Sequence, residues 1–91
     1  MAKYRVVLTR QAKEHLTAHR KSGDKAVAKR IDRILAELCE HPETGAGNPE
    51  RLRFQLSGFW SRRISLEHRI IYRIENDTVE VTVVSAFGHY I

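Results

Sequence analysis

The sequence predicts an α+β domain in which two helices pack on one twisted antiparallel sheet, with the elements in the order β-α-α-β-β-β-β. Two observations lead to this fold class. Apolar residues recur at the helical period as far as about residue 38 and alternate with a period of two beyond residue 51. A loop-like stretch with two glycines and a proline, residues 43–50, separates the two patterns. Because the chain has 91 residues, we expect residues 1–91 to form one domain.

The N-terminal half is expected to contain one strand and two helices. Residues 3–8 have strand character, and Thr9 can cap an amphipathic helix from about Arg10 to Lys21. Asp24 can cap a second helix, and Pro42 ends it, because the residue before a proline avoids the helical conformation. One apolar stripe at the helical period marks this second helix: Val27, Ile31, Ile34, Leu35 and Leu38.

The C-terminal half is expected to form four strands joined by short turns. The strands are placed at about residues 52–56, 59–65, 69–75 and 78–86. The turns are placed at Ser57-Gly58, around Leu66–His68 and at Asn76-Asp77. With residues 3–8, these strands complete the expected sheet.

Apolar residues also predict the register of the two middle strands. Trp60 and Ile64 must share a face with Tyr72, because a slip of one residue would exchange core and solvent. Arg62 and Arg63 are adjacent and point to opposite faces, so at least one of them is expected at the surface or at a dimer contact. The register places three arginines together on the surface opposite the apolar face: Arg63, Arg69 and Arg73.

Charge is unevenly distributed along the chain. The net charge is +5 with a pI near 9.8, which favours a polyanionic partner. Residues 47–73 hold six arginines and no lysine against Glu50 and Glu67. The planar fork of arginine suits phosphate, although charge alone favours an ordinary solvated basic face.

Several classes of protein are excluded by composition. No apolar run approaches the length of about 18 residues that spans a bilayer, so we expect a cytoplasmic protein without a membrane anchor. The only cysteine, Cys39, cannot form an internal disulfide or a cysteine-based zinc site. His15 and His19 have the i, i+4 spacing of a metal pair but lack an evident third ligand. No metal ion and no cofactor are therefore expected.

The remaining polar residues suit the cleavage of RNA. Attack by a 2′-OH group on the adjacent phosphate needs a general base, cations for the charge of the phosphorane, and a general acid with a pKa near 7. Glu50, the pair Arg63 and Arg69, and His89 could fill these roles without a metal ion. The residue types are common, so composition alone gives this hypothesis little weight.

A resemblance to a known family adds to this reasoning. The run Leu56-Ser57-Gly58-Phe59-Trp60-Ser61-Arg62-Arg63-Ile64 is followed by Glu67-His68-Arg69-Ile70-Ile71-Tyr72 and by a terminal His89-Tyr90. This series, with Gly45-Ala46-Gly47-Asn48-Pro49-Glu50 before it, closely resembles the Txe/YoeB family of bacterial toxins in the RelE-like superfamily. The resemblance covers essentially the whole chain and is looser in residues 1–44.

The resemblance implies a RelE-like fold and an endoribonuclease that cuts mRNA in the ribosomal A site and so inhibits translation. It also implies a cognate antitoxin, whose disordered part folds over the toxin, and a homodimer. By position, Glu50 corresponds to the general base, His89 to the general acid, Arg69 to the transition-state clamp, and Tyr90 to a residue that orients the RNA. Further basic positions of the family's site, expected to bind RNA, correspond to Arg53 and Arg63.

Two other kinds of protein remain open. A non-catalytic RNA-binding or ribosome-binding module of the same fold would share these features. A small transcriptional regulator fits less well, because no helix-turn-helix with a basic recognition helix is visible. The sequence also departs from the family in Ile91, which follows His89-Tyr90, and in Phe87-Gly88, which precedes it. Both departures affect the fine geometry expected for the site.

Overall fold

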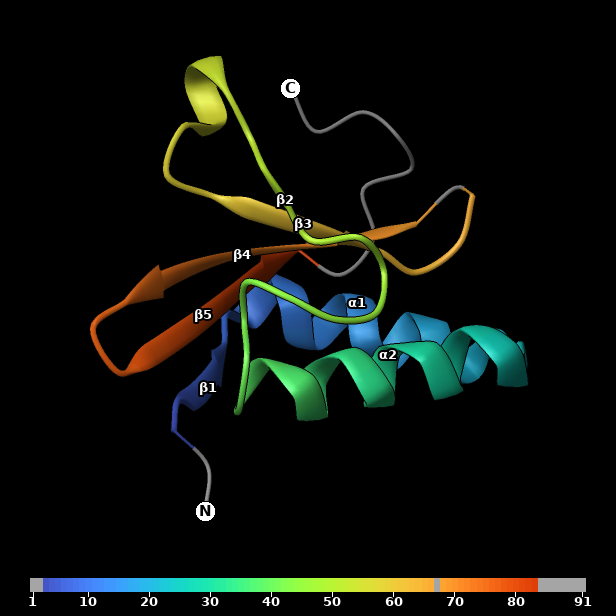
Figure 1. Cartoon of the computed structure of the whole chain (residues 1–91). Helices are drawn as coiled ribbons and strands as arrows, with labels where there is room; N and C mark the ends of the chain where they lie inside the picture. The colour runs from blue at the N-terminus through green and yellow to red at the C-terminus, as the bar shows by residue number, and fades with distance from the viewer. Residues whose placement is uncertain (1–2, 67, 84–91) are drawn as a thin grey trace.

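The structure, a computed structural model, describes residues 3–66 and 68–83, and in this part of the chain two helices lie on one face of a five-stranded sheet (Figure 1). The elements are β1 (Arg5–Leu8), α1 (Arg10–Lys21), α2 (Lys25–Leu38), β2 (Glu50–Arg51), the 3-10 helix η1 (Phe54–Leu56), β3 (Trp60–Arg63), β4 (Arg69–Glu75) and β5 (Thr78–Val83). The predicted α+β class and the order β-α-α-β-β-β-β are confirmed.

The two helices begin where their caps were predicted. The Thr9 hydroxyl accepts a hydrogen bond from the Ala12 N–H at 3.1 Å, and the Asp24 carboxylate accepts one from the Val27 N–H at 3.1 Å. Between them the chain turns at Gly23, whose φ of +79° is readily adopted only by glycine. These local bonds explain why the bounds of α1 match the prediction.

The sheet has the strand order β1-β5-β4-β3-β2 and is mixed, not wholly antiparallel as expected. Of the four strand pairings in the described part, three are antiparallel, whereas β1 runs parallel to β5 with Val6 opposite Val79. Parallel neighbours need a long crossover connection. The helices and the other strands supply one here, because β1 and β5 come from opposite ends of the chain.

The strand predicted at residues 52–56 is wrong. Strand β2 is limited to Glu50–Arg51, and η1 occupies Phe54–Leu56. The Ser57 N–H donates to the Phe54 carbonyl at 3.0 Å, which closes a tight turn in place of an extended ladder. Of the last predicted strand, residues 78–83 form β5 and the remainder lies outside the described residues.

The core fills the space between the helices and the sheet. Trp60 lies opposite Tyr72 and Arg62 lies opposite Ile70, so the predicted register of β3 and β4 is confirmed. The most deeply buried apolar residues come from α1, α2 and the middle strands: Ala12, Ile31, Ile34, Leu38, Ile70, Tyr72, Val79 and Val81. None of the helices in the described part is long and apolar enough to cross a membrane.

Candidate functional site

Sheet register brings three of the predicted site residues to one face. Glu50 lies opposite Ser61, and Arg63 lies opposite Arg69. Directly opposed residues share a face, as do residues two apart on one strand, so these four side chains project on the same side. The intervening Arg62 reaches Glu37 of α2, which shows that the shared face is turned away from the helices.

The charged groups on this face are available to a ligand. Glu50 and Arg63 are exposed and Arg69 is half-buried. Among the described residues, none of the three forms an ion pair. Two cations and one carboxylate therefore stand at accessible positions of this face, although Ser61 and Ile71 between them are buried.

The third arginine predicted on this face, Arg73, is already engaged. Its guanidinium forms ion pairs with Glu75 at 3.1 Å and Glu80 at 3.3 Å, and it lies 5.7 Å from the centre of the Phe59 ring. Arg73 therefore has less positive charge to offer an anion than Arg63 and Arg69.

Arg53 reaches the site from a different element. It precedes η1 and lines, with Glu50, a cleft of about 800 Å³ beside β2. Arg51, the next residue of β2, lies opposite Trp60, and its guanidinium is 5.3 Å from the centre of the Trp60 ring. Glu50 thus belongs both to the sheet face that it shares with Arg63 and Arg69 and to this cleft.

The remaining predicted residues, His89 and Tyr90, lie outside the described residues. The same holds for Ile91 and for Phe87-Gly88. The structure thus brings together Glu50, Arg63 and Arg69, with Arg53 at the adjacent cleft, and the roles of His89 and Tyr90 stay predictions.

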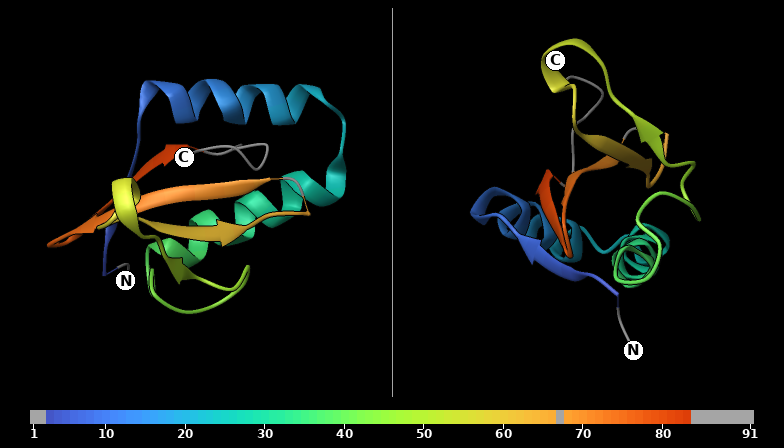
Figure 2. Two further views of the ribbon diagram at one scale, coloured as in Figure 1. Left: turned by 90° about the horizontal axis from the view of Figure 1, so that it is seen from above. Right: turned by 60° about the vertical axis from the view of Figure 1, so that its left-hand side comes forward.

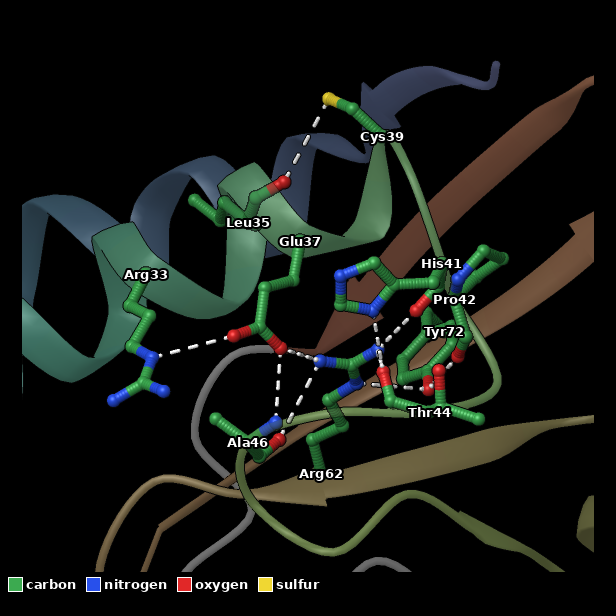
Figure 3. Close-up of polar contacts among 10 residues, drawn as sticks. All are labelled: Arg33, Leu35, Glu37, Cys39, His41, Pro42, Thr44, Ala46, Arg62 and Tyr72. Atoms are coloured by element: carbon green, nitrogen blue, oxygen red, sulfur yellow. Dashed lines mark hydrogen bonds and ion pairs between the residues drawn. The ribbon is translucent and has the colours of Figure 1, made fainter. Parts of the chain in front are cut away.

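Sequence reasoning missed the part played by Arg62, which is fully buried (Figure 3). Its guanidinium donates to the Glu37 carboxylate at 2.7 Å, to the carbonyls of His41 and Thr44 at 2.6 Å each, and to the Tyr72 hydroxyl at 3.3 Å. The alternation of side chains along β3 predicted that Arg62 and Arg63 point apart. No local signal identified the acceptors, which come from α2, from β4 and from the loop after α2.

Hydrogen bonds lower the pKa of one ionisable partner of Arg62, Glu37, and burial raises the pKa of the other, Tyr72. Burial raises the pKa of the Glu37 carboxyl, but hydrogen bonds from the Ala46 N–H, Arg62 and Arg33 outweigh it and hold the pKa below its usual range. Burial raises the pKa of the Tyr72 phenol, which donates its own hydrogen bond to the Pro42 carbonyl. Glu37 therefore stays a carboxylate that accepts from Arg62, and Tyr72 stays a neutral phenol that donates to Pro42. We call Arg62 with its hydrogen-bond partners the arginine cluster.

This cluster fixes the loop that leads to Glu50. Beyond the bonds to Arg62, the Gly47 carbonyl accepts a hydrogen bond from the Arg63 N–H at 2.7 Å. A Cβ at Gly47 would lie 2.6 Å from the Arg63 carbonyl oxygen, and its φ is +84°, so only glycine fits. The Arg62 side chain and the Arg63 N–H, two neighbouring groups of β3, therefore hold the loop and determine where Glu50 enters the sheet.

A family model and curated proteins with similar sequences identify the family of this chain. Residues 8–90 match a family model described as the YoeB-like toxin of bacterial type II toxin-antitoxin systems. The chain is 46% identical to Toxin YoeB of Mycobacterium bovis over 69 residues, which are 76% of this chain and 79% of the relative.

Two solved structures from Staphylococcus aureus, each 28% identical, cover 92% of this chain and 97% of their own. They are a YoeB dimer, with a TM-score of 0.78, and a heterotetrameric YoeB-YefM toxin-antitoxin complex, with a TM-score of 0.76. On this evidence, the chain belongs to the YoeB-like toxins of bacterial type II toxin-antitoxin systems.

Proposed function

We propose that this toxin is an endoribonuclease that cuts mRNA in the ribosomal A site and thereby inhibits translation. The observation that supports the proposal is the grouping of Glu50, Arg63 and Arg69 on one sheet face of a YoeB-like toxin. A carboxylate on the same face as two arginines is suited to a phosphodiester, because the three groups offer a base and a cationic clamp together.

The reaction is a transfer of the phosphate from the 5′-oxygen to the 2′-oxygen. Glu50 takes the proton of the 2′-OH, and the 2′-oxygen attacks the phosphorus. Arg69, with Arg63, stabilises the charge of the phosphorane. His89 protonates the 5′-oxygen as its bond to phosphorus breaks, which leaves a 2′,3′-cyclic phosphate and a free 5′-OH. In this scheme Tyr90 orients the RNA, Arg53 binds it, and no step needs a metal ion.

The ribosome supplies the geometry that this surface lacks. Glu50 and Arg63 are exposed side chains of β2 and β3, and exposed groups hold a flexible RNA poorly in the in-line arrangement that attack requires. A codon in the A site is already ordered. We therefore expect ribosome-bound mRNA to be cut fast and free RNA to be cut slowly.

The proposal includes a cognate antitoxin and a homodimer as partners. The Staphylococcus aureus relatives form a YoeB dimer and a YoeB-YefM complex. Arg63 and Arg69, which form no ion pair among the described residues, are suited to an acidic antitoxin segment that becomes ordered on binding.

Expression without the antitoxin, with mapping of mRNA 5′ ends on ribosomes, tests the activity. The wild type is expected to arrest growth and to produce new 5′ ends at A-site codons. Glu50→Gln and Arg69→Ala are expected to lower the cleavage rate by about 10²–10³-fold or more. Their matched controls, Glu40→Gln and Arg5→Ala, change exposed residues away from the site and should cut normally.

A wild type that binds ribosomes but neither arrests growth nor produces new 5′ ends would contradict the proposal. The chain would then be the alternative, a non-catalytic ribosome-binding module of the same fold. Equal rates on free and ribosome-bound RNA would instead contradict the role given to the ribosome.

A further inference from the structure

The first residue of η1, Phe54, has two unfavourable features at once. Its side chain is 85% exposed, and its backbone has a φ of 58°. An aromatic side chain gains nothing by standing in water, and a bulky residue in the left-handed region is strained. Strain of this kind persists where the surrounding structure enforces it, and it is concentrated at functional sites.

Backbone hydrogen bonds around η1 enforce the conformation. The Leu56 N–H donates to the Arg53 carbonyl at 3.1 Å, the Phe59 N–H donates to the Leu56 carbonyl at 3.0 Å, and the Leu52 N–H donates to the Phe59 carbonyl at 2.9 Å. They close a compact tip with Phe54 on it. Within the described part of the chain, the Phe54 ring packs against no aromatic ring and no cation.

The tip lies on the side of the molecule where the candidate site is. Figures 1 and 2 show η1 projecting from the sheet away from α1 and α2, which is the side to which Glu50, Arg63 and Arg69 point. The residue before Phe54 is the exposed Arg53. The exposed Phe54 therefore belongs to an element that projects on the same side of the sheet as the proposed catalytic groups, and it follows the exposed Arg53 in the chain.

We propose that Phe54 is a stacking platform for an unpaired base of the RNA, with Arg53 holding an adjacent phosphate. The inference rests on the proposed function and adds a subsite to it. A single exposed ring beside a cation suits a nucleotide, which offers a flat base and a charge together. An apolar peptide helix would need a row of apolar side chains. Around the tip, Arg51, Arg53 and Gln55 are exposed and polar.

Substitutions at Phe54 separate stacking from folding. Phe54→Leu keeps an apolar side chain without an aromatic face, and Phe54→Trp enlarges that face. Phe54→Asn removes the ring but tolerates the left-handed backbone. On ribosome-bound mRNA, Phe54→Leu and Phe54→Asn are expected to lower kcat/KM by about 10- to 100-fold, whereas Phe54→Trp should keep the wild-type value. The Tm of the Asn variant should equal or exceed that of the wild type.

Leu66→Ala is the matched control. Leu66 is 95% exposed and lies in the connection between β3 and β4, at the other end of the sheet from η1 (Figures 1 and 2). Its loss should leave kcat/KM unchanged, which would show that exposed apolar surface in general is not what matters.

A second measurement keeps the test independent of cleavage. The affinity of each full-length protein for a fluorescent single-stranded oligoadenylate should fall from Phe54→Trp to the wild type, then to Phe54→Leu and last to Phe54→Asn. This order is expected even if the wild type proves unable to cut mRNA. Equal binding and equal kcat/KM for Phe54→Leu and the wild type would overturn the stacking role. A lower Tm for Phe54→Asn would assign the ring to folding. Loss of antitoxin binding alone would make the tip a protein contact.

Discussion

At the scale of single residues, the proposed chemistry gives one proton transfer to each of two groups. Glu50 removes the proton of the 2′-OH, and His89 protonates the 5′-oxygen. His89→Gln keeps hydrogen-bonding groups but cannot donate a proton to the leaving 5′-oxygen. We expect the single-turnover cleavage rate on ribosomes to fall by about 10²–10⁴-fold. We expect the wild type to lose rate at alkaline pH, where a histidine acid is deprotonated, and the variant to lack this loss.

His15→Gln provides the control, because it changes a histidine of α1 outside the proposed site. Ribosome binding should be unchanged in both variants. If His89→Gln cleaves at the wild-type rate, the acid is another group, and Tyr90 is then the first to test.

His19 predicts a pH dependence of stability that is separate from catalysis. Its side chain is 8% exposed and meets the His68 ring edge-on, with the centroids 4.7 Å apart. Burial lowers the pKa of His19 below its ordinary value of 6.5, and the nearby His68 and His15 lower it further, against a smaller opposing effect of Asp24.

The unfolded chain then binds a proton at His19 that the folded chain does not, in the interval between the lowered pKa and 6.5. The free energy of unfolding should therefore fall as the pH drops below about 6.5, and the fall is complete below the lowered pKa. Urea unfolding between about pH 7.5 and about pH 5 measures this. His19→Gln should flatten the dependence of the free energy of unfolding on pH. If the slope is unchanged in this variant, other groups cause the pH dependence.

At the scale of elements, the critical junction joins β3, the end of α2 and the loop that leads into β2. Arg62→Met removes the donor shared by Glu37 and the loop carbonyls and leaves a partly buried carboxylate without its main partner. Breaking such a pair costs about 3–5 kcal/mol in the free energy of unfolding. Urea denaturation should show a loss of this size, and cleavage should fall because the loop positions Glu50.

Arg33→Ala is the control for this junction. Arg33 pairs with the other oxygen of Glu37 at 3.2 Å, but its side chain is 66% exposed, so its loss should cost only about 0–1 kcal/mol. Equal losses for Arg62→Met and Arg33→Ala would contradict the importance given to the buried contacts.

At the scale of the whole molecule, charge dominates what the protein can bind. With a net charge of +5, and with Arg63 and Arg69 unpaired among the described residues, binding of an acidic antitoxin segment should depend strongly on salt. We expect the affinity for the antitoxin encoded beside it to fall between about 0.1 M and about 0.5 M salt. Titration calorimetry at the two concentrations measures the change, and salt-independent binding would point to an apolar interface.

Several features of this protein follow from its sequence by short-range physics. The caps at Thr9 and Asp24, the helical stripe of α2 and the two-residue turn before Thr78 depend on residues a few positions apart, and all were predicted. The shared face of Trp60 and Tyr72 was predicted too, because a slip of one residue would have exchanged core and solvent. The motif from residue 45 onward was enough to predict the family.

Tertiary structure alone decided the rest. The parallel pairing of β1 with β5 and the partners of Arg62 depend on contacts between distant parts of the chain. The Thr9 hydroxyl donates to the Thr82 carbonyl 73 residues away, and Arg62 donates to Glu37 25 residues away. The turn at Phe54 replaced an expected strand, because its left-handed backbone is imposed by the bonds that close η1. Periodicity reports which residues share a face, but partners far along the chain determine what that face meets.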